Sequence, residues 1–186
     1  MRSDEDGWFW CQWTPATAEN RAFEDVAQAV EKFRSLDTPA GRGATRWLKE
    51  EALANHPSTV SYVLVRDGRI EGYFALASSS VELKQSHRKA LSSGQRGHRL
   101  TPTQGASLVA WIARHAEAEI DGVLLLKFAL SIARRAAFLQ GAVALVLDPF
   151  DEQLAKLWVE RYGFVQSQTR VRGGELRRLW FPLYPR

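Results

Sequence analysis

Cysteine is nearly absent from this 186-residue sequence, which has one, at position 11. Cys11 has no partner for an internal disulfide and no second cysteine for a metal cage, so the sequence excludes a disulfide scaffold and a cysteine-bound zinc site. His87 and His98 are too far apart and unsupported by other ligands to suggest a metal. This cysteine usage is typical of a reducing compartment, and we expect a cytoplasmic protein without a metal.

Long apolar runs are also missing. No run approaches the roughly 20 residues of a membrane-spanning helix, and the N-terminal segment MRSDEDGWFW is acidic where a signal peptide would be basic. We therefore expect neither export nor contact with a membrane. The sequence has no internal repeat and no low-complexity tract, and its length suits one domain over residues 1–186.

The sequence is organised around residues 106–138. Residues 107–113 are apolar and rich in β-formers, which predicts a buried strand, and residues 121–138 carry apolar side chains at 124, 125, 128, 132 and 136, which predicts a helix with one buried face. One polar turn, HAEAEID, joins them and leads into Gly122. A strand that runs directly into a long helix aims the unpaired N–H groups of the helix beyond the strand end, a geometry that suits an anionic ligand.

Strands and helices alternate along the rest of the chain. Asp67-Gly68 between two apolar runs predicts a type I′ hairpin, because both residues tolerate a positive φ. Residues 79–104 form a polar, basic excursion with a helical turn near 85–91, and Gly173-Gly174 marks a late reversal. The remaining expected elements are strands at 8–13, 59–66, 69–78, 142–148, 164–169 and 176–183, and helices at 21–33, after a Thr45 cap, and at 151–162.

Positive charge gathers in two segments, residues 84–99 and 170–178. If the two segments meet, they form a basic surface that attracts phosphate-bearing partners such as tRNA. The alternative is that these side chains lie separately on solvated loops. The candidate contacts in the first segment are Lys84, Arg88, Lys89, Arg96 and Arg99.

The order of elements resembles the GNAT superfamily of acyl-CoA-dependent N-acetyltransferases over nearly the whole chain. The local similarities are GYFALASSSVEL after the hairpin, the strand-loop-helix at 107–138, and WVERYGF at 158–164 before a late hairpin. The segments FRSLD, YVLV and GYFALA are similar to the acetyltransferase toxins of toxin–antitoxin pairs. The resemblance implies an α/β (α+β) fold, in which helices cover both faces of a mixed central sheet with a splayed parallel pair.

In this superfamily acetyl-CoA lies in the splay. Its pantetheine arm pairs with strand backbone, and loop amides before the helix hold its pyrophosphate. The resemblance therefore implies an acetyl-CoA site formed by the strand end and the following loop, at Trp111, Ile112, Ala113, Arg114, Ala118, Glu119, Ile120, Asp121, Gly122 and Val123.

The loop departs from the superfamily pattern Q/R-x-x-G-x-G/A. The aligned residues are EAEIDG at 117–122, so only the final glycine is kept. Ile120 cannot adopt a positive φ cheaply, and the carboxylates of Glu117, Glu119 and Asp121 would repel a diphosphate by about 1 kcal/mol each at an exposed loop. These changes predict weakened acetyl-CoA binding.

The expected general acid is also missing. In the pattern F/L-Y-x-x-x-G-F the tyrosine protonates the departing CoA thiolate, and Val159 stands at that position here. Tyr162 is expected in the core, and Asp148 and Glu152 are expected either as bases or at a helix N-cap. No residue can be assigned a catalytic role from the sequence.

Two functions remain. The first is an N-acetyltransferase that moves an acetyl group from acetyl-CoA to a primary amine, such as that of an aminoacyl-tRNA or another phosphate-bearing acceptor. The second is a catalytically degenerate GNAT-fold module that binds nucleic acid or a protein without CoA chemistry. The toxin resemblance implies an antitoxin partner, and an exposed aromatic strand at 8–13 suggests a homodimer.

Overall fold

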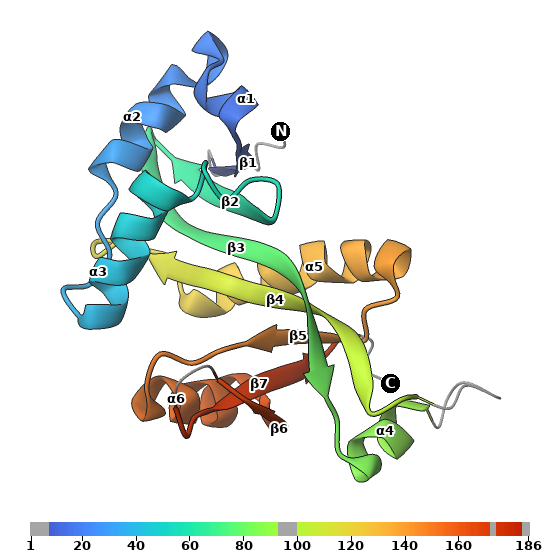
Figure 1. Cartoon of the computed structure of the whole chain (residues 1–186). Helices are drawn as coiled ribbons and strands as arrows, with labels where there is room; N and C mark the ends of the chain where they lie inside the picture. Colours follow the sequence, from blue (N-terminus) through green and yellow to red (C-terminus); the bar gives the residue numbers. More distant parts are fainter. Residues whose placement is uncertain (1–7, 93–99, 172–173, 184–186) are drawn as a thin grey trace. The chain divides into compact units, whose positions relative to one another are not determined.

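The computed structural model describes residues 8–92, 100–171 and 174–183. Its strands form a seven-stranded sheet in the order β1-β2-β3-β4-β5-β7-β6 (Figure 1). Strands β4 and β5 pair in parallel, whereas β1–β2, β2–β3, β5–β7 and β6–β7 are antiparallel, so the predicted mixed sheet is confirmed. The strand bounds are β1 (Trp8–Trp13), β2 (Thr59–Arg66), β3 (Arg69–Glu82), β4 (Thr103–Arg114), β5 (Ala144–Leu147), β6 (Val165–Arg170) and β7 (Arg177–Pro182).

Helices α1, α3 and α6 begin after residues whose side chains accept a hydrogen bond from a free helix amide: Thr14, Thr38 and Asp151. Thr38 accepts a hydrogen bond from the Gly41 amide and is followed by Pro39, so α3 starts there. The predicted cap Thr45 is wrong, since Thr45 lies inside α3 and donates to the Gly41 carbonyl. The helical bounds are α1 (Pro15–Ala18), the 3₁₀ turn η1 (Arg21–Phe23), α2 (Glu24–Lys32), α3 (Pro39–Arg46), the π turn η2 (Trp47–Glu51), α4 (Gln85–Ser92), α5 (Gly122–Gln140) and α6 (Glu152–Tyr162).

The chain forms two compact units. The first contains Met1–Ala77 and Ala110–Lys127, and the second contains Ser78–Val109 and Phe128–Arg186. The expectation of one domain over 1–186 stays a prediction. None of the described helices combines the length and apolar character needed to cross a membrane.

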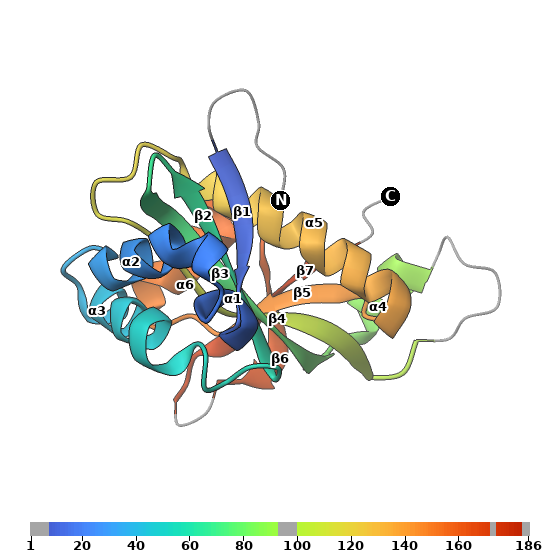
Figure 2. The ribbon, with the colours of Figure 1, turned by 90° about the horizontal axis from the view of Figure 1, so that it is seen from above.

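In the first unit α2 and α3 lie together beside β2 and β3 (Figure 2). Their shared core contains Val30, Phe33, Leu48 and Tyr73, all at most 1% exposed. The Tyr73 hydroxyl donates to the Ala44 carbonyl at 2.7 Å, and burial raises the pKa of Tyr73. The apolar side chains of α2 and of the strands thus pack into one core that is rich in aromatic residues.

The predicted hairpin joins β2 and β3. Asp67 and Gly68 have φ of 50° and 72°, the left-handed values that a type I′ turn requires. Strand β3 continues to Glu82, past the predicted end at 78, and β4 begins at Thr103. The excursion between β3 and β4 contains α4, as expected, and Gly173 of the late reversal lies outside the described residues.

The predicted buried face of α5 is right at Leu125 and wrong at its four other positions. In α5 the buried side chains are Leu125, Leu126, Ala129, Leu130, Ala133 and Ala137, whereas 124, 128, 132 and 136 are only half-buried. Alanines bury fully because they let the helix approach its neighbours closely, and a pattern of large side chains misses them. In α6 no residue is buried, and Leu157 is 40% exposed.

Gly72 in β3 is a position where the chain passes close to its neighbours. A Cβ there would lie 2.8 Å from the Leu125 side chain and 3.0 Å from the Ala113 carbonyl oxygen. We expect Gly72→Ala to lower the free energy of unfolding by about 1–3 kcal/mol through overpacking, measured by urea denaturation. Gly105→Ala in β4 is the matched control, because its Cβ would meet atoms no closer than 3.7 Å and should change stability little.

Candidate functional site

The connection from β4 to α5 lies where the sequence places it. The parallel pairing of β4 with β5 covers Ala106–Val109 and stops where β5 ends, at Leu147. Residues 110–114 of β4 continue past that point, the loop 115–121 follows, and α5 begins at Gly122. The residues expected to bind acetyl-CoA, from the strand end and the loop, therefore all lie in the first unit.

Most N–H groups of this connection already have acceptors in the chain. Two carboxylates supply acceptors, since Glu71 Oε2 receives the Glu119 amide at 3.1 Å and Asp121 Oδ1 receives the Val123 amide at 3.0 Å. The other bonds run from His115 to the Glu71 carbonyl, Ala116 to the Arg34 carbonyl, Glu117 to the His115 ring, Ala118 to the His115 carbonyl and Leu124 to the Asp121 carbonyl. The expected cradle runs from Ala118 to Val123. Leaving aside Asp121, which has an interaction of its own, two amides of the cradle donate no hydrogen bond within the described part of the chain: those of Ile120 and Gly122.

Ile120 does not carry the predicted backbone strain. Among the described residues other than glycine, Asp67 is the one with a positive φ. Ile120 is 5% exposed and packs with Leu64 and Leu125, and its carbonyl accepts from Arg114 Nη1 at 2.6 Å. The isoleucine therefore anchors the loop in the core rather than replacing a glycine in a strained turn.

The three loop carboxylates are compensated by the chain itself. Glu119 pairs with Arg66 at 2.6 Å, and Glu117 lies 3.9 Å from Arg69. Asp121 caps α5, where a negative charge is favourable. Because each charge is paired or placed at the helix start, the repulsion of an anion is smaller than the isolated carboxylates would cause.

Glu71 was missed by sequence reasoning. Its side chain is 1% exposed and accepts from Arg69 Nε at 2.7 Å as well as from the Glu119 amide. The hydrogen bond to Glu71 raises the pKa of Arg69. The available signal was a lone carboxylate inside the apolar strand segment RIEGYFALA, because such a charge is buried only when it is paired. A hollow of about 310 Å³ adjoins this cluster, lined by Arg66, Asp67, Arg69, Glu71 and Glu119.

Several solved structures have a similar fold. A tyrosine-to-phenylalanine mutant of KacT superposes with a TM-score of 0.68 at 17% identity, covering 94% of this chain and 95% of that one. A tyrosine-to-phenylalanine mutant of the AtaT toxin, bound to the C-terminus of the antitoxin AtaR, superposes with a TM-score of 0.65 at 15% identity. The match covers 96% of this chain and 93% of that one. AtaT complexed with acetyl-methionyl-tRNAfMet superposes with a TM-score of 0.62 at 18% identity, and the match covers 82% of this chain and 86% of that one.

The chain has the GNAT fold. No protein-family model and no curated protein sequence matches it, so the similarity is one of fold. The predicted resemblance to GNAT-fold toxins is confirmed at the level of the fold.

In this GNAT-fold chain Trp111 is committed to packing. Its ring stacks on Trp47 with centroids 5.9 Å apart, and Trp47 stacks on Tyr73 at 6.0 Å and 9°. A side of the Trp111 indole also faces Gly43 of α3. The strand end that the GNAT resemblance assigns to the pantetheine arm is thus held by an aromatic contact with Trp47, the first residue of η2.

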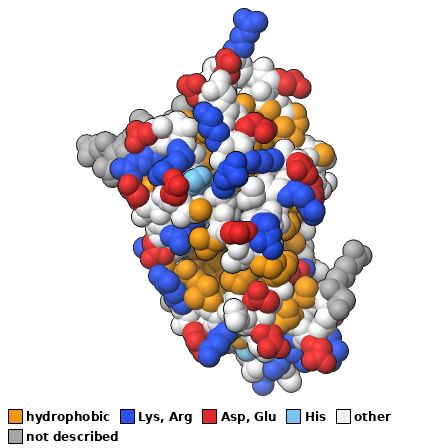
Figure 3. All heavy atoms as spheres, turned by 90° about the vertical axis from the view of Figure 1, so that its left-hand side faces the viewer, with side chains coloured by type: hydrophobic (Ala, Val, Ile, Leu, Met, Phe, Trp, Pro, Cys, Tyr) orange, Lys and Arg blue, Asp and Glu red, His pale blue; other side chains and the backbone are white. Residues whose placement is uncertain are grey.

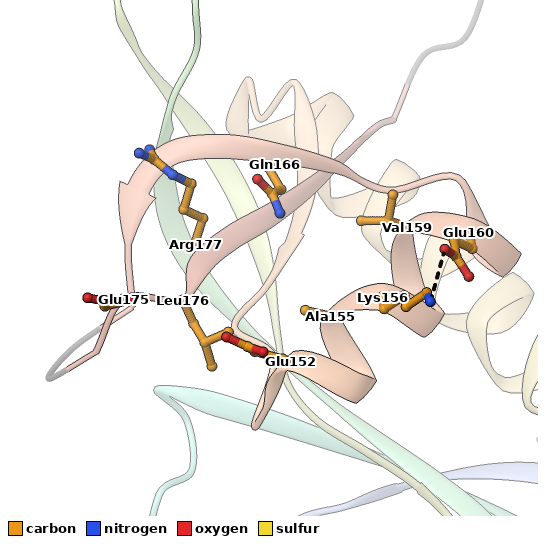
Figure 4. Close-up of a pocket in the computed structure, with 9 residues that line it drawn as sticks. All are labelled: Glu152, Ala155, Lys156, Val159, Glu160, Gln166, Glu175, Leu176 and Arg177. Carbon is orange, nitrogen blue, oxygen red and sulfur yellow. Dashed lines mark ion pairs between the residues drawn. The ribbon is translucent and has the colours of Figure 1, made fainter.

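The general-acid position of the GNAT pattern holds no proton donor. Val159 is 36% exposed and lines a hollow of about 620 Å³ between α6, β6 and β7, where Lys156 pairs with Glu160 (Figure 4). Tyr162 is half-buried rather than in the core, with its ring 4.8 Å from Trp158. The chain therefore has no tyrosine hydroxyl at the general-acid position of the pattern.

The alternatives for the residues after β5 are resolved in part. Asp148 forms a double hydrogen bond with Arg178, at 2.7 Å for both oxygens, so it is not an N-cap. Asp151 is the N-cap of α6, and Glu152 is the first residue of that helix, on the edge of the hollow. Arg178 lies on β7, the antiparallel neighbour of β5, so this ion pair ties the end of β5 to β7.

The basic segments are less available than the sequence suggests. Helix α4 meets β7 where the His87 ring lies 5.1 Å from Trp180, but Arg88 donates to the Leu100 carbonyl and Arg178 is paired with Asp148. Lys84 and Lys89 are exposed, whereas Arg96, His98 and Arg99 lie outside the described residues. On the face in Figure 3, cationic and anionic side chains are interspersed. The described residues contain no cluster of potential metal ligands.

Proposed function

We propose that this protein is an acetyl-CoA-dependent N-acetyltransferase. The observation that carries the proposal is the pair of undonated amides, Ile120 and Gly122, at the start of the 19-residue helix α5. Such amides, together with the helix dipole, favour an anion such as a pyrophosphate. The GNAT fold supplies the context, since AtaT has been solved with acetyl-CoA bound.

The roles of the residues follow from their places. Ile120 and Gly122 donate to the pyrophosphate, and the backbone of Trp111–Ala113, past the β4–β5 pairing, extends along the pantetheine arm. Arg114 holds the loop through the Ile120 carbonyl and does not have to touch the ligand. Acetyl-CoA supplies a thioester whose thiol has a pKa of about 8.5, so the attacking amine can expel the thiolate near neutral pH without a protein acid.

The acceptor class we favour is an aminoacyl-tRNA. AtaT has been solved with acetyl-methionyl-tRNAfMet, and two exposed cations, Lys84 just before α4 and Lys89 within it, offer phosphate contacts on this chain. The complex of AtaT with the C-terminus of AtaR likewise supports a protein antitoxin as a partner. A homodimer stays a prediction.

A second candidate function has an observation of its own. Glu71 and Asp121 occupy two amides of the loop with carboxylates of the chain, which would suit a GNAT-fold module that binds no CoA. The two functions differ in their response to acetyl-CoA.

Acetyl-CoA should stabilise the protein against heat. At one hundred times the dissociation constant, a ligand that binds only the folded state adds about 2.7 kcal/mol, which raises the Tm of a chain of this size by roughly 5–10 °C. Differential scanning fluorimetry measures the shift, with ADP as the comparison ligand. An unchanged Tm at millimolar acetyl-CoA would favour the binding module.

The Gly122 amide can be deleted without removing the helix. Proline at the first helical position keeps the backbone shape but has no N–H, so Gly122→Pro should weaken acetyl-CoA binding about tenfold while leaving the Tm of the free protein nearly unchanged. Isothermal titration calorimetry gives the dissociation constants. Gly122→Ala keeps the amide and serves as control, and equal affinities for the two variants would contradict this role.

The acceptor class can be tested by measuring the free CoA thiol that is released when an acceptor is acetylated. Lys84→Gln combined with Lys89→Gln should raise the KM for a charged tRNA and lower the slope of log KM against log salt by about two, one for each lost phosphate contact. The same variant should be unchanged with a small primary amine as acceptor. A small amine that is acetylated as efficiently as the tRNA by the unmodified protein would count against a nucleic-acid acceptor.

A further inference from the structure

Glu71 is the most deeply buried carboxylate of the described chain and has no place in the chemistry outlined above. It stands near the start of β3, two residues after Arg69 and at 1% exposure. A buried carboxylate is costly unless hydrogen bonds and an opposite charge compensate it. Its place beside the apolar residues of β3 calls for a role that an apolar residue could not fill.

One residue holds the loop at two points, its first residue and Glu119. The Glu71 carbonyl accepts the amide of His115, the first loop residue, at 2.8 Å, and the Glu71 carboxylate accepts the Glu119 amide at 3.1 Å. Between these two points the loop cannot shift along β3 without breaking a hydrogen bond. Ile120 follows directly and is fixed by its own packing against Leu64 and Leu125.

The carboxylate is itself fixed. Arg69 donates Nε and Nη2 to Glu71 Oε1, which leaves Oε2 for the Glu119 amide. Arg69 also lies 3.9 Å from Glu117, so the same guanidinium compensates a second loop carboxylate. This arrangement sets the direction of Oε2 and therefore the position of the Glu119 peptide, one residue before the first undonated amide.

We propose that Glu71 is a positioning residue that orients the Ile120 and Gly122 amides toward one phosphate group of acetyl-CoA. The inference rests on the proposed function. Glu71 does not touch the ligand. It sets the loop, and the loop presents the amides, so its loss raises the cost of arranging those donors on binding.

The test compares Glu71→Ala and Glu71→Gln with Arg42→Ala. Glutamine keeps an acceptor for the Glu119 amide but loses the charge that pairs with Arg69, whereas alanine loses both. Arg42, in α3, forms an exposed ion pair with Asp37 and controls for removal of a surface charge. Steady-state kinetics are measured with acetyl-CoA and with S-acetylpantetheine, which has the same thioester arm and no pyrophosphate.

For Glu71→Ala we expect KM for acetyl-CoA to rise at least about tenfold with kcat nearly unchanged, because a hydrogen bond to a charged group is lost. Its kcat/KM with S-acetylpantetheine should stay within about twofold of the unmodified protein. The KM of Glu71→Gln for acetyl-CoA should lie between those of Glu71→Ala and the unmodified protein, and the KM of Arg42→Ala should equal that of the unmodified protein. Hydrogen exchange at the Glu119 amide should be faster in Glu71→Ala.

Equal losses with both donors would overturn the proposal in favour of a general structural role, and tighter acetyl-CoA binding would show that Glu71 competes with the phosphate. If Glu71→Ala does not fold, Glu71→Gln decides through the same ratio between the two donors. Failure of the unmodified protein to bind acetyl-CoA would reject the proposed function itself. Binding by the unmodified protein with unaltered kinetics in both variants would reject only the role of Glu71.

Discussion

The compensation of one buried carboxylate governs the part of this structure that matters for function. Glu71 can lie inside the first unit only because Arg69 and a backbone amide surround it, and satisfying those donors fixes the hairpin end, the start of β3 and the loop after β4 together. That arrangement holds the Glu119 peptide, and packing against Leu64 and Leu125 holds Ile120 next to it. A short charged network, rather than a glycine-rich sequence, therefore shapes the loop.

Local signals in the sequence were sufficient for most of the sheet. Asp67-Gly68 determines its turn through backbone preferences of two adjacent residues, and the run around Leu145 can only be a covered strand. Thr38-Pro39 carried an equally local signal for the start of α3 that was overlooked in favour of Thr45. The buried face of α5 depended on which alanines approach their neighbours, which tertiary packing decides.

The position of the loop between β4 and α5 was predictable, but its internal contacts were not. Sequence order alone locates the loop between strand and helix, and it gives the right residues for the N-terminus of α5. The acceptor of the Glu119 amide lies 48 positions away, and the partners of Glu117 and Glu119 come from the β2–β3 hairpin. No periodicity or spacing reports such pairs, so the loop carboxylates looked unfavourable when each was considered without its arginine.

The hydrogen bonds already made inside the loop have a thermodynamic consequence for any ligand that binds there. A segment whose amides are bonded before the ligand arrives is preorganised, so association loses little conformational entropy and needs no prior folding of the loop. Affinity then depends on a small number of direct contacts, and the association rate is set by diffusion and by access rather than by a conformational step.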